Sequence, residues 1–401
     1  MNTSIKNKAS MTKVMALGLL LATLLVVALS VGPAGAVATP GKASAWGDND
    51  KGQLGNGRFG TARNIPKAVS NIGGVKSVKA GCYHSLALKI DGTVRAWGDN
   101  GNGQLGNGTN RSRTVPVKVR IKNVKAIAAG CTHSLALKRD GTVWAWGDGF
   151  YGQLGNGRFR ASSNVPVRVD NLGTGTRAIA AGKNFSLALM GDNRVRSWGY
   201  NAEGELGNGT SGPETNRARP VPVRNLANVR MISTDSYADH TLALLANGTV
   251  RAWGGNYYGA LGDGTAANFR PKPVVVSQLS GVKAIAAGGF HSLALLTNGR
   301  VRSWGYNSDG QLGNNAHGSG TNSSTPVAVK GLLNVKSISG GAYNSMAVLE
   351  SGGARSWGDN SRGQLGTGRT GPDRDVPAGI RNLTNVKNID GGFEFALAAT
   401  R

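Results

Sequence analysis

Histidine is the residue type in this sequence best suited to acid-base or metal chemistry, and four of the five histidines occupy one repeated position. Each of the four stands directly before a Ser-Leu-Ala-Leu or Thr-Leu-Ala-Leu segment; they are His84, His133, His240 and His291. Three further copies of the segment carry other residues there, which we identify as Phe185, Asn344 and Glu394. A position that the repeat itself dictates indicates a structural hydrogen bond, with a ring of metal ligands as the alternative.

Other patterns of catalytic or ligand-binding residues are absent from the sequence. It contains no HExxH, CxxC or DxDxDG motif, and glycine-rich segments such as GDNGNGQLGNG (98–108) lack the Lys-Ser/Thr ending of a phosphate-binding loop. The acidic pairs Glu203 with Glu205 and Asp235 with Asp239 have no repeated or mechanistic context. We therefore predict no catalytic residue, no metal and no cofactor, and a protein that is not an enzyme.

Arginine forms a more informative pattern. Five of seven Trp-Gly pairs have arginine two residues before the tryptophan: Arg95, Arg196, Arg251, Arg302 and Arg355. Guanidinium groups at one radius of a symmetric ring would bind carboxylates or phosphates in a bidentate manner. The alternative is a structural role, in which each arginine lies between two repeats and contacts an aromatic ring or a loop carbonyl.

A second set of candidate binding residues follows the Gln-Leu-Gly segments of the first repeats. It combines arginine with phenylalanine and consists of Arg58, Phe59, Arg111, Arg113, Arg158, Phe159 and Arg160. Arginine beside aromatic residues is typical of protein interfaces and also of grooves that bind polyanions. The sequence does not distinguish between these two uses.

The two cysteines, Cys82 and Cys131, each follow the glycine of a Gly-Cys-x-His-Ser motif. Their separation of 49 residues matches no zinc pattern. Equivalent positions of adjacent repeats lie close together in space, so a disulfide is one interpretation for a chain in an oxidising compartment. Two buried free thiols are the other, and the sequence alone favours them.

These residues are positioned by a repeat that occurs seven times. Trp-Gly pairs begin at Trp46, Trp97, Trp146, Trp198, Trp253, Trp304 and Trp357, at intervals of 49 to 55 residues. A Gly/Asn-rich stretch that contains GQLG, GELG or GALG follows each pair, and a Leu-Ala-Leu-like segment repeats with the same period. A period of this length indicates a propeller or a solenoid.

Each repeat contains four segments that we expect to be short strands. HSLAL (84–88) and GTVRAW (92–97) alternate between two faces around a turn at Asp91-Gly92, and VKAIAAG (124–130) is a third strand. The fourth, VPVKV (115–119), carries proline and should lie at a sheet edge, because proline cannot donate to a β-ladder. Its equivalents are Pro66, Pro116, Pro166, Pro222, Pro273, Pro326 and Pro377.

The two ends of the chain complement each other. The repeats begin with a Trp-Gly strand (43–47) that has no Leu-Ala-Leu strand before it, and they end with FEFALAA (393–399), which has no Trp-Gly strand after it. Pairing these half-repeats would close a ring and remove two exposed edges. We predict an all-β fold, a single seven-bladed β-propeller over residues 37–401 with four-stranded blades, as a monomer.

Residues 1–36 have the composition of a secretory signal peptide. Lys6, Lys8 and Lys13 precede an apolar run from Val14 to Val31, and small residues follow at Ala34 and Ala36. We expect cleavage after Ala36 and a secreted or envelope-associated protein, with an uncleaved membrane anchor as the alternative. Removing three lysines lowers the net charge from +25 to +22 (25 − 3), and such a charge favours anionic partners.

The repeated motifs HSLAL, DGTVxAWG and GQLGxG, followed by a proline-containing strand, resemble the regulator of chromosome condensation repeat family over residues 38–401. This resemblance implies a seven-bladed propeller. The founding member of the family is a guanine nucleotide exchange factor that binds chromatin, and other members are binding platforms. The signal-like N-terminus favours an exported bacterial-type member, such as the one that inhibits a β-lactamase.

From these observations we expect an exported, non-catalytic platform that binds a protein through loops on one propeller face. The alternative is a binder of anionic envelope polymer or nucleic acid, which would lose affinity steeply with salt. Guanine nucleotide exchange and inhibition of a secreted hydrolase are weaker candidates.

Overall fold

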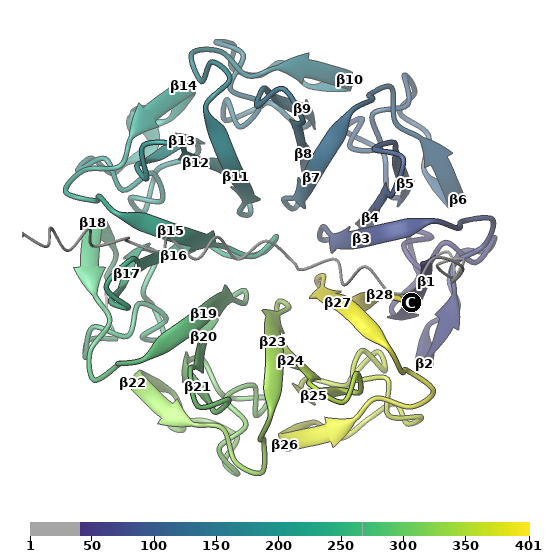
Figure 1. Cartoon of the computed structure of the whole chain (residues 1–401), viewed down its shortest axis with the longest axis vertical. Helices are drawn as coiled ribbons and strands as arrows, with labels where there is room; N and C mark the ends of the chain where they lie inside the picture. The colour runs from purple at the N-terminus through teal and green to yellow at the C-terminus, as the bar shows by residue number, and fades with distance from the viewer. Residues whose placement is uncertain (1–40, 267) are drawn as a thin grey trace, which may run out of the picture. The chain divides into compact units, whose positions relative to one another are not determined.

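The seven blades predicted from the repeat are present and form a closed ring (Figure 1). The structure, a computed structural model, describes residues 41–266 and 268–401. The expected signal peptide, residues 1–36, lies outside the described residues. Among the described residues, no helix is long and apolar enough to cross a bilayer.

Each blade is an antiparallel sheet of four strands, here called the first to the fourth from the axis outward. Six blades are continuous in sequence. They are β3–β6 (Val75–Ala80, His84–Lys89, Val94–Gly98, Arg113–Lys118), β7–β10 (Val124–Ala129, His133–Lys138, Val143–Gly147, Ser163–Arg168), β11–β14 (Thr176–Ala181, Phe185–Met190, Val195–Gly199, Arg217–Pro222), β15–β18 (Val229–Ser233, His240–Leu245, Val250–Gly254, Arg270–Val275), β19–β22 (Val282–Ala287, His291–Leu296, Val301–Gly305, Ser323–Ala328) and β23–β26 (Val335–Gly340, Asn344–Leu349, Ala354–Gly358, Arg374–Gly379). One short 3-10 helix, η1 (Pro213–Thr215), lies in the loop before β14.

The seventh blade joins the two ends of the described chain, as the half-repeats predicted. Its strands are β27 (Val386–Gly391), β28 (Phe395–Thr400), β1 (Lys42–Gly47) and β2 (Arg63–Ala68). β1 and β28 pair in unbroken register from Lys42 with Thr400 to Gly47 with Phe395. Because of this pairing, neither β1 nor β28 has an unpaired edge inside the blade.

The proline-containing strands are the outermost strands of their blades, where a missing N–H group has no sheet partner to lose. Register corrects one assignment. The residue that matches Pro116, the fourth residue of β6, is Pro220 in β14, whereas Pro222 lies opposite Arg196 at the end of that strand.

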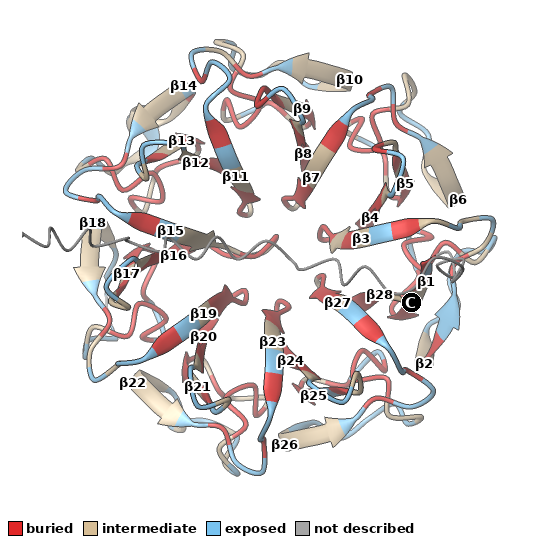
Figure 2. Cartoon of the chain, viewed as in Figure 1, coloured by how far each residue is buried: buried red, intermediate tan, exposed pale blue. Residues whose placement is uncertain are grey.

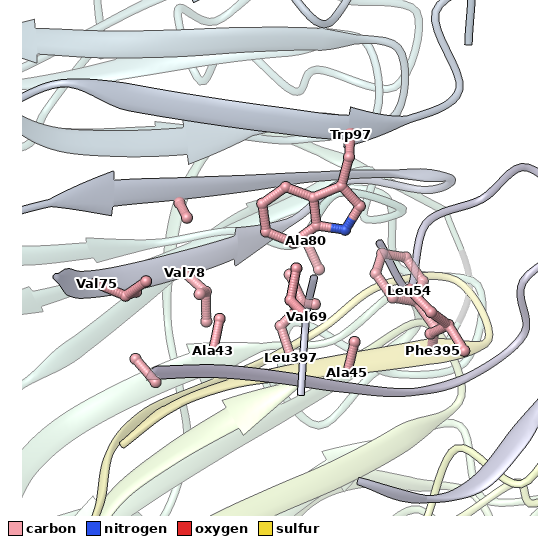
Figure 3. Packing of buried hydrophobic residues seen from close by; sticks show 12 residues of the cluster. Ala43, Ala45, Leu54, Val69, Val75, Val78, Ala80, Trp97, Phe395 and Leu397 are labelled. Atoms are coloured by element: carbon pink, nitrogen blue, oxygen red, sulfur yellow. The ribbon is translucent and has the colours of Figure 1, made fainter. Parts of the chain in front are cut away.

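The core lies between adjacent blades rather than at the centre of the ring. In Figure 3, Ala43 and Ala45 of β1 and Leu397 of β28 face Val78 of β3 and the indole of Trp97. All seven repeat tryptophans are fully buried in such interfaces. Burying one tryptophan removes about 200 Å² from water and contributes roughly 5 kcal/mol as an upper estimate. Small residues on the second strands leave the room that these large side chains need.

Figure 1 shows the first strands β3, β7, β11, β15, β19, β23 and β27 converging from mid-radius toward the axis. They enclose a central funnel of about 470 Å³, lined by residues of these seven strands together with Thr234, Asp235 and Ser236. We call the end of the ring where the first strands begin the funnel face. The opposite end, where they finish, is the long-loop face.

Candidate protein-binding face

The long-loop face carries two sets of loops. Gly98 pairs with both His84 and Arg113, so the third-to-fourth-strand loops begin at the same end of the blade as the first-to-second-strand loops. The first set is long and spans residues 48–62, 99–112, 148–162, 200–216, 255–269, 306–322 and 359–373. The second set is short, with three residues in six blades and six residues, 234–239, in the blade of β15.

The Gln-Leu-Gly segment holds each long loop against the next blade. The indole Nε1 of Trp97 donates a hydrogen bond of 2.8 Å to the carbonyl of Gln53, and Ser85 donates to the same carbonyl. Equivalent tryptophan bonds of 2.8 to 2.9 Å occur at all seven blade interfaces. The repeated Trp-Gly and Gln-Leu-Gly motifs are therefore the two halves of one inter-blade contact.

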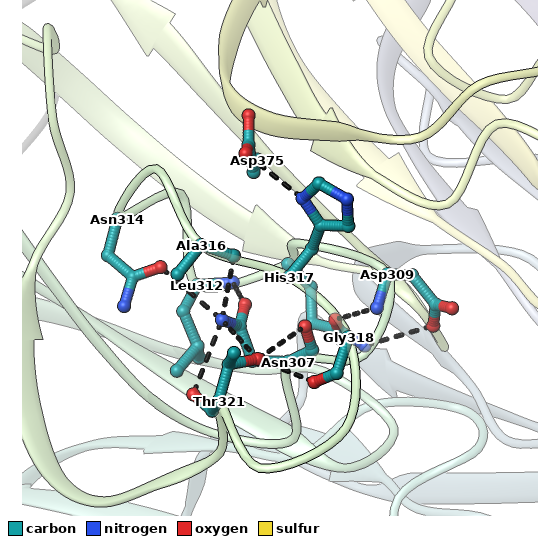
Figure 4. A network of polar contacts seen from close by, with 10 residues as sticks. Asn307, Asp309, Leu312, Asn314, Ala316, His317, Gly318, Thr321 and Asp375 are labelled. Carbon is teal, nitrogen blue, oxygen red and sulfur yellow. Dashed lines mark hydrogen bonds and ion pairs between the residues drawn. The ribbon is translucent and has the colours of Figure 1, made fainter.

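A buried asparagine organises the interior of six of the seven long loops. Figure 4 shows the example of Asn307, whose Oδ1 accepts from the Leu312 amide at 2.9 Å and whose Nδ2 donates to the Ala316 carbonyl at 2.9 Å. In the same loop, His317 contacts Asp375 of the next blade at 3.1 Å. The remaining loop has Gly149 at this position, where a Cβ would lie 2.2 Å from the Ala161 carbonyl.

The four repeated histidines make structural hydrogen bonds. Their Nε2 atoms lie 2.7 to 2.9 Å from a serine hydroxyl of the next blade, in the pairs His84–Ser134, His133–Ser186, His240–Ser292 and His291–Ser345. Burial lowers the pKa values of the four imidazoles to about 4, 3, 4 and 3, so they are neutral at physiological pH. Among the described residues, no group of three or more acidic, histidine or cysteine side chains could hold a metal ion.

One assignment to the histidine position was wrong. Phe395 pairs with Gly47 as His84 pairs with Gly98, so Phe395 rather than Glu394 is the equivalent residue. The Leu-Ala-Leu segment of the last repeat has Ala396 in place of serine, which obscured the alignment. Glu394 instead lies in the short loop, half-buried, with its carboxylate 3.7 Å from Arg362.

The six-residue loop places Tyr237 among rings from other blades. Its ring centroid lies 4.8 Å from that of Phe393, 5.7 Å from that of Phe290 and 6.2 Å from that of Tyr343. Tyr83 extends the group through Phe393 at 5.5 Å. These five residues, the central aromatic cluster, come from short loops of five blades, so they lie at the axis on the long-loop face. Asp235 and Ser236 of the same loop also line the funnel.

Exposed aromatic side chains extend this surface outward. Six of the nine exposed large hydrophobic residues among the described ones are aromatic and lie in three long loops: Phe59, Phe150, Phe159, Tyr257, Tyr258 and Phe269. Tyr258 contacts Phe290 at 5.7 Å, which joins this set to the central aromatic cluster.

The arginine and phenylalanine candidates from the sequence lie on this face. Arg58, Phe59, Arg111, Arg158, Phe159 and Arg160 are exposed in long loops, whereas Arg113 is half-buried at the start of β6. The Arg160 guanidinium lies 5.5 Å from the Phe150 ring, a cation–π distance. The structure therefore brings the loop candidates onto one face, although they belong to three different blades.

The other arginine set lies elsewhere. Each member is the second residue of a third strand, beside the fourth strand; they are Arg95, Arg196, Arg251, Arg302 and Arg355. Arg355 is exposed and the other four are half-buried. Within the described part of the chain, none of the five makes a side-chain hydrogen bond or an ion pair, and none stacks on an aromatic ring, so the expected structural contacts are not seen.

An acidic group that had no repeated context in the sequence adjoins the aromatic surface. A Cβ on Gly255 would lie 2.4 Å from Glu203 Oε2 and 3.5 Å from Asp239 Cβ, and Tyr257 donates to Glu203 Oε1 at 2.8 Å. Burial raises the pKa of Asp239 to about 6 and the pKa of Glu205, which stands where five other repeats have glutamine, to about 8. Lys183 approaches Asp239 at 3.5 Å.

Cys82 and Cys131 are joined in a disulfide between the short loops of adjacent blades, with Cα atoms 4.5 Å apart. The sequence alone favoured two free thiols, because the proximity of equivalent positions in adjacent repeats does not show that the two sulfur atoms come within bonding distance. The bond links two of the blades that surround the axis on the long-loop face.

The fold and this face define a class: seven-bladed propellers in which loops at one end present an aromatic and charged surface. The chain belongs to the family of RCC1-like domains, whose model matches residues 20–238. Models of the regulator of chromosome condensation (RCC1) repeat match further segments, at 232–260, 282–311 and 335–364, and at 247–295 and 298–348. The resemblance seen in the repeated motifs is thereby confirmed.

Two named relatives are similar to this chain in sequence. The ultraviolet-B receptor UVR8 of Arabidopsis thaliana is 35% identical over 214 residues, which are 52% of this chain and 47% of UVR8. The human E3 ubiquitin-protein ligase HERC2 is 34% identical over 360 residues, 86% of this chain. The chain spans about half the length of UVR8 and 7% of HERC2.

Solved structures share the fold. Prp20p of Saccharomyces cerevisiae, studied for its binding to Gsp1p and histones, superposes with a TM-score of 0.80 at 25% identity, covering 90% of this chain and 92% of Prp20p. Human WBSCR16 gives 0.78 at 24% identity over 90% of this chain and 99% of its own. These relatives come from eukaryotes, so they give no support to the expectation of a bacterial-type member.

Proposed function

We propose that this chain is a non-catalytic platform that binds a protein partner through its long-loop face. The observation that carries the proposal is the presence of six exposed aromatic side chains in the loops of that face, one of which, Tyr258, contacts the central aromatic cluster. Aromatic residues and arginine are enriched at the energetic centres of protein interfaces. The arrangement fits such a centre, with Arg58, Arg158 and Arg160 exposed in the same long loops as Phe59 and Phe159.

The comparisons support a binding role in a general way. Prp20p was studied for its binding to Gsp1p and histones, and a related structure shows it bound to Kap60. Guanine nucleotide exchange on a small GTPase is a narrower form of the proposal, as is inhibition of a secreted hydrolase. No feature of the long-loop face specifically supports either activity. We therefore propose only what both share, the binding of a protein partner.

We propose also that the protein is exported, because the sequence of residues 1–36 has a basic start, an apolar run and small residues before Ala36. N-terminal sequencing of the protein from its source cell tests this. A first residue at position 37 supports cleavage and export. A mature chain that begins at Met1 and is found in the cytoplasm contradicts it.

The binding proposal is tested by a pull-down with residues 37–401 as bait at low and high salt. These residues include the complete ring, since β1 and β28 close it within residues 42–400. A discrete protein retained at high salt supports the platform. Recovery of only nucleic acid or anionic polymer, lost as salt rises, supports the alternative, in which the positive net charge is the functional property.

Two triple variants test whether the long-loop face is the one that binds the partner. The triple substitution Phe59→Ala, Phe159→Ala and Tyr257→Ala removes exposed aromatic rings from three long loops and should weaken partner binding at least tenfold, because hot-spot residues contribute about 2 kcal/mol or more each. The matched control, Ile90→Ala, Val275→Ala and Leu333→Ala, removes exposed apolar side chains outside the long loops. Equal losses in both variants would contradict the assignment of the face.

A further inference from the structure

A ring of basic residues surrounds the mouth of the funnel. In all seven blades, the second residue of the first strand is lysine or arginine: Lys76, Lys125, Arg177, Arg230, Lys283, Lys336 and Lys387. We call this set the cation ring. Six members are exposed and Lys125 is half-buried. The set is recognisable in the sequence once the seven repeats have been aligned by structure. The alignment shows that a basic residue is the second residue of the innermost strand in every blade.

A β-bulge presents each member of the ring. Val75 pairs with Lys89 and Ser77 pairs with Leu88, so two steps along β3 match one step along β4 and Lys76 is the extra residue. The same shift occurs at the equivalent position of every other blade. A bulge releases its extra residue from the ladder and redirects its side chain. Seven equivalent bulges therefore set seven cationic side chains at equivalent places around the axis.

The ring lies at the rim of the funnel face. The first strands begin at mid-radius and point inward, so their second residues lie at the wide end (Figure 1). Exposed positions appear near the outer ends of these strands in Figure 2. Gly41, at the start of the described fold, accepts a hydrogen bond of 2.9 Å from the amide of Val75, directly before Lys76. The described part of the chain therefore begins at this rim.

Carboxylates do not neutralise the ring. Within the described residues, no member has an ion-pair partner; Arg177 donates to the amide oxygen of Asn193, and Arg230 donates to the carbonyl of Val282 at 2.8 Å. Two acids of neighbouring hairpins are engaged by other lysines, in the pairs Lys89–Asp91 at 3.6 Å and Lys138–Asp140 at 3.1 Å. The field at the rim is therefore positive.

The interior of the funnel is less suited to an anion than its rim. Lys79 there is paired with Asp390 at 2.6 Å, and Asp235 also lines the funnel. A linear polyanion lying across the mouth would contact only part of a circle of cations. An extended anionic surface can contact all of it without entering the funnel.

Two further features point to a lipid surface. All six exposed aromatic side chains among the described residues lie in long loops, so none of these six is on the funnel face for a nucleic acid base to stack on. The apolar side chains exposed near the rim are aliphatic: Ile90, whose amide donates to Gly74, and Leu333, which precedes β23.

We propose that the funnel face docks onto a membrane that contains anionic lipids, with the cation ring contacting the headgroups. This role is separate from protein binding at the long-loop face, so one face would be held at the membrane while the other remains accessible. It does not require that residues 1–36 be retained.

Vesicle sedimentation with residues 37–401 tests the proposal. We expect binding to vesicles with about 30% phosphatidylglycerol in phosphatidylcholine and none to phosphatidylcholine alone. The variant Lys283→Gln, Lys336→Gln and Lys387→Gln removes three exposed charges of the ring. Because each lysine near such a surface strengthens binding about fivefold, the partition coefficient should fall about 100-fold.

A matched control separates the ring from net charge. The variant Arg58→Gln, Arg158→Gln and Arg369→Gln removes three exposed charges from long loops and should retain most of the binding. An equal fall in both variants overturns the proposal, as does absence of vesicle binding by the unmodified protein. Binding of duplex DNA that depends on the ring, without vesicle binding, overturns it in favour of nucleic acid. Matching thermal unfolding curves show that both variants are folded.

Discussion

The substitution His133→Phe tests whether the inter-blade histidines make the propeller sensitive to acid. His133 is fully buried, its Nε2 lies 2.9 Å from the Ser186 hydroxyl, and burial, followed by the charge of His84, lowers its pKa to about 3. Two other blades hold a phenylalanine in the same position, Phe185 and Phe395. The glycine three residues earlier, Gly130, provides the room, because a Cβ there would lie 2.2 Å from the imidazole. Phenylalanine therefore fits.

The magnitude follows from proton linkage. A histidine whose pKa is near 6.5 in the unfolded chain and about 3 in the folded protein is neutral in both states above pH 6.5, so it does not lower stability there. As the pH falls below 6.5, the unfolded chain binds a proton that the folded protein does not bind, and the free energy of unfolding decreases. Between pH 7 and pH 5 the loss is about 2 kcal/mol per histidine, and it hardly depends on the folded pKa while that value stays at about 4 or below. At pH 7, His133→Phe should cost about 1 kcal/mol for the lost hydrogen bond.

The variant should therefore be less stable than the unmodified protein at pH 7 and equal to it or more stable at pH 5. Equilibrium unfolding in urea, followed by fluorescence of the buried tryptophans at both pH values, measures this. The difference between the two proteins is the relevant quantity, because Glu205 and Asp235, whose pKa values burial raises to about 8, stabilise the fold as pH falls. A stability difference that does not change with pH would refute the reasoning.

Three further substitutions test the contacts that hold the ring together. Trp304→Phe removes a fully buried indole and its 2.9 Å hydrogen bond to Ala260; we expect a loss of about 2–3 kcal/mol in the free energy of urea unfolding. Replacing Cys82 and Cys131 by serine opens a loop of 49 residues and should cost about 4 kcal/mol, whereas unchanged stability in the oxidised protein would show that the bond does not form. Gly103→Ala should lower the midpoint of thermal unfolding by several degrees, because Gly103 has φ +83° and a Cβ there would lie 2.6 Å from the Cα atom of Asn164. Gly101→Ala is the control, because the nearest atom to a Cβ at that position lies 4.0 Å away.

The chain of hydrogen bonds between blades could be predicted only in part. The recurrence of Trp-Gly and Gln-Leu-Gly required a repeated contact, and the structure shows it as the bond from each indole to the loop carbonyl of the preceding blade. The histidine position was correctly interpreted as structural. Its equivalent in the last blade was misassigned to Glu394, because a one-residue error in strand register cannot be detected where the serine is replaced by Ala396.

The candidate site was predicted less completely. Arg58, Phe59, Arg158 and Phe159 were recognisable because they follow the repeated Gln-Leu-Gly segments, and the structure places them on the long-loop face. Tyr237 was not recognisable, because its position depends on a short loop of six residues where the other blades have three. Glu203 and Asp239 were dismissed for lack of context, since they are far apart in sequence and meet only beside Gly255.

The sequence by itself determined the number of blades, the strand order and the closure of the ring, because each of these follows from counting a repeat and comparing its incomplete ends. Only the tertiary structure decided which residues share a face. The bulge that exposes Lys76 and its six equivalents, and the inward tilt that gathers them around the funnel, depend on register and strand direction. The physical reason is that a repeat specifies contacts between neighbouring blades, whereas a binding surface depends on the spatial arrangement of all seven.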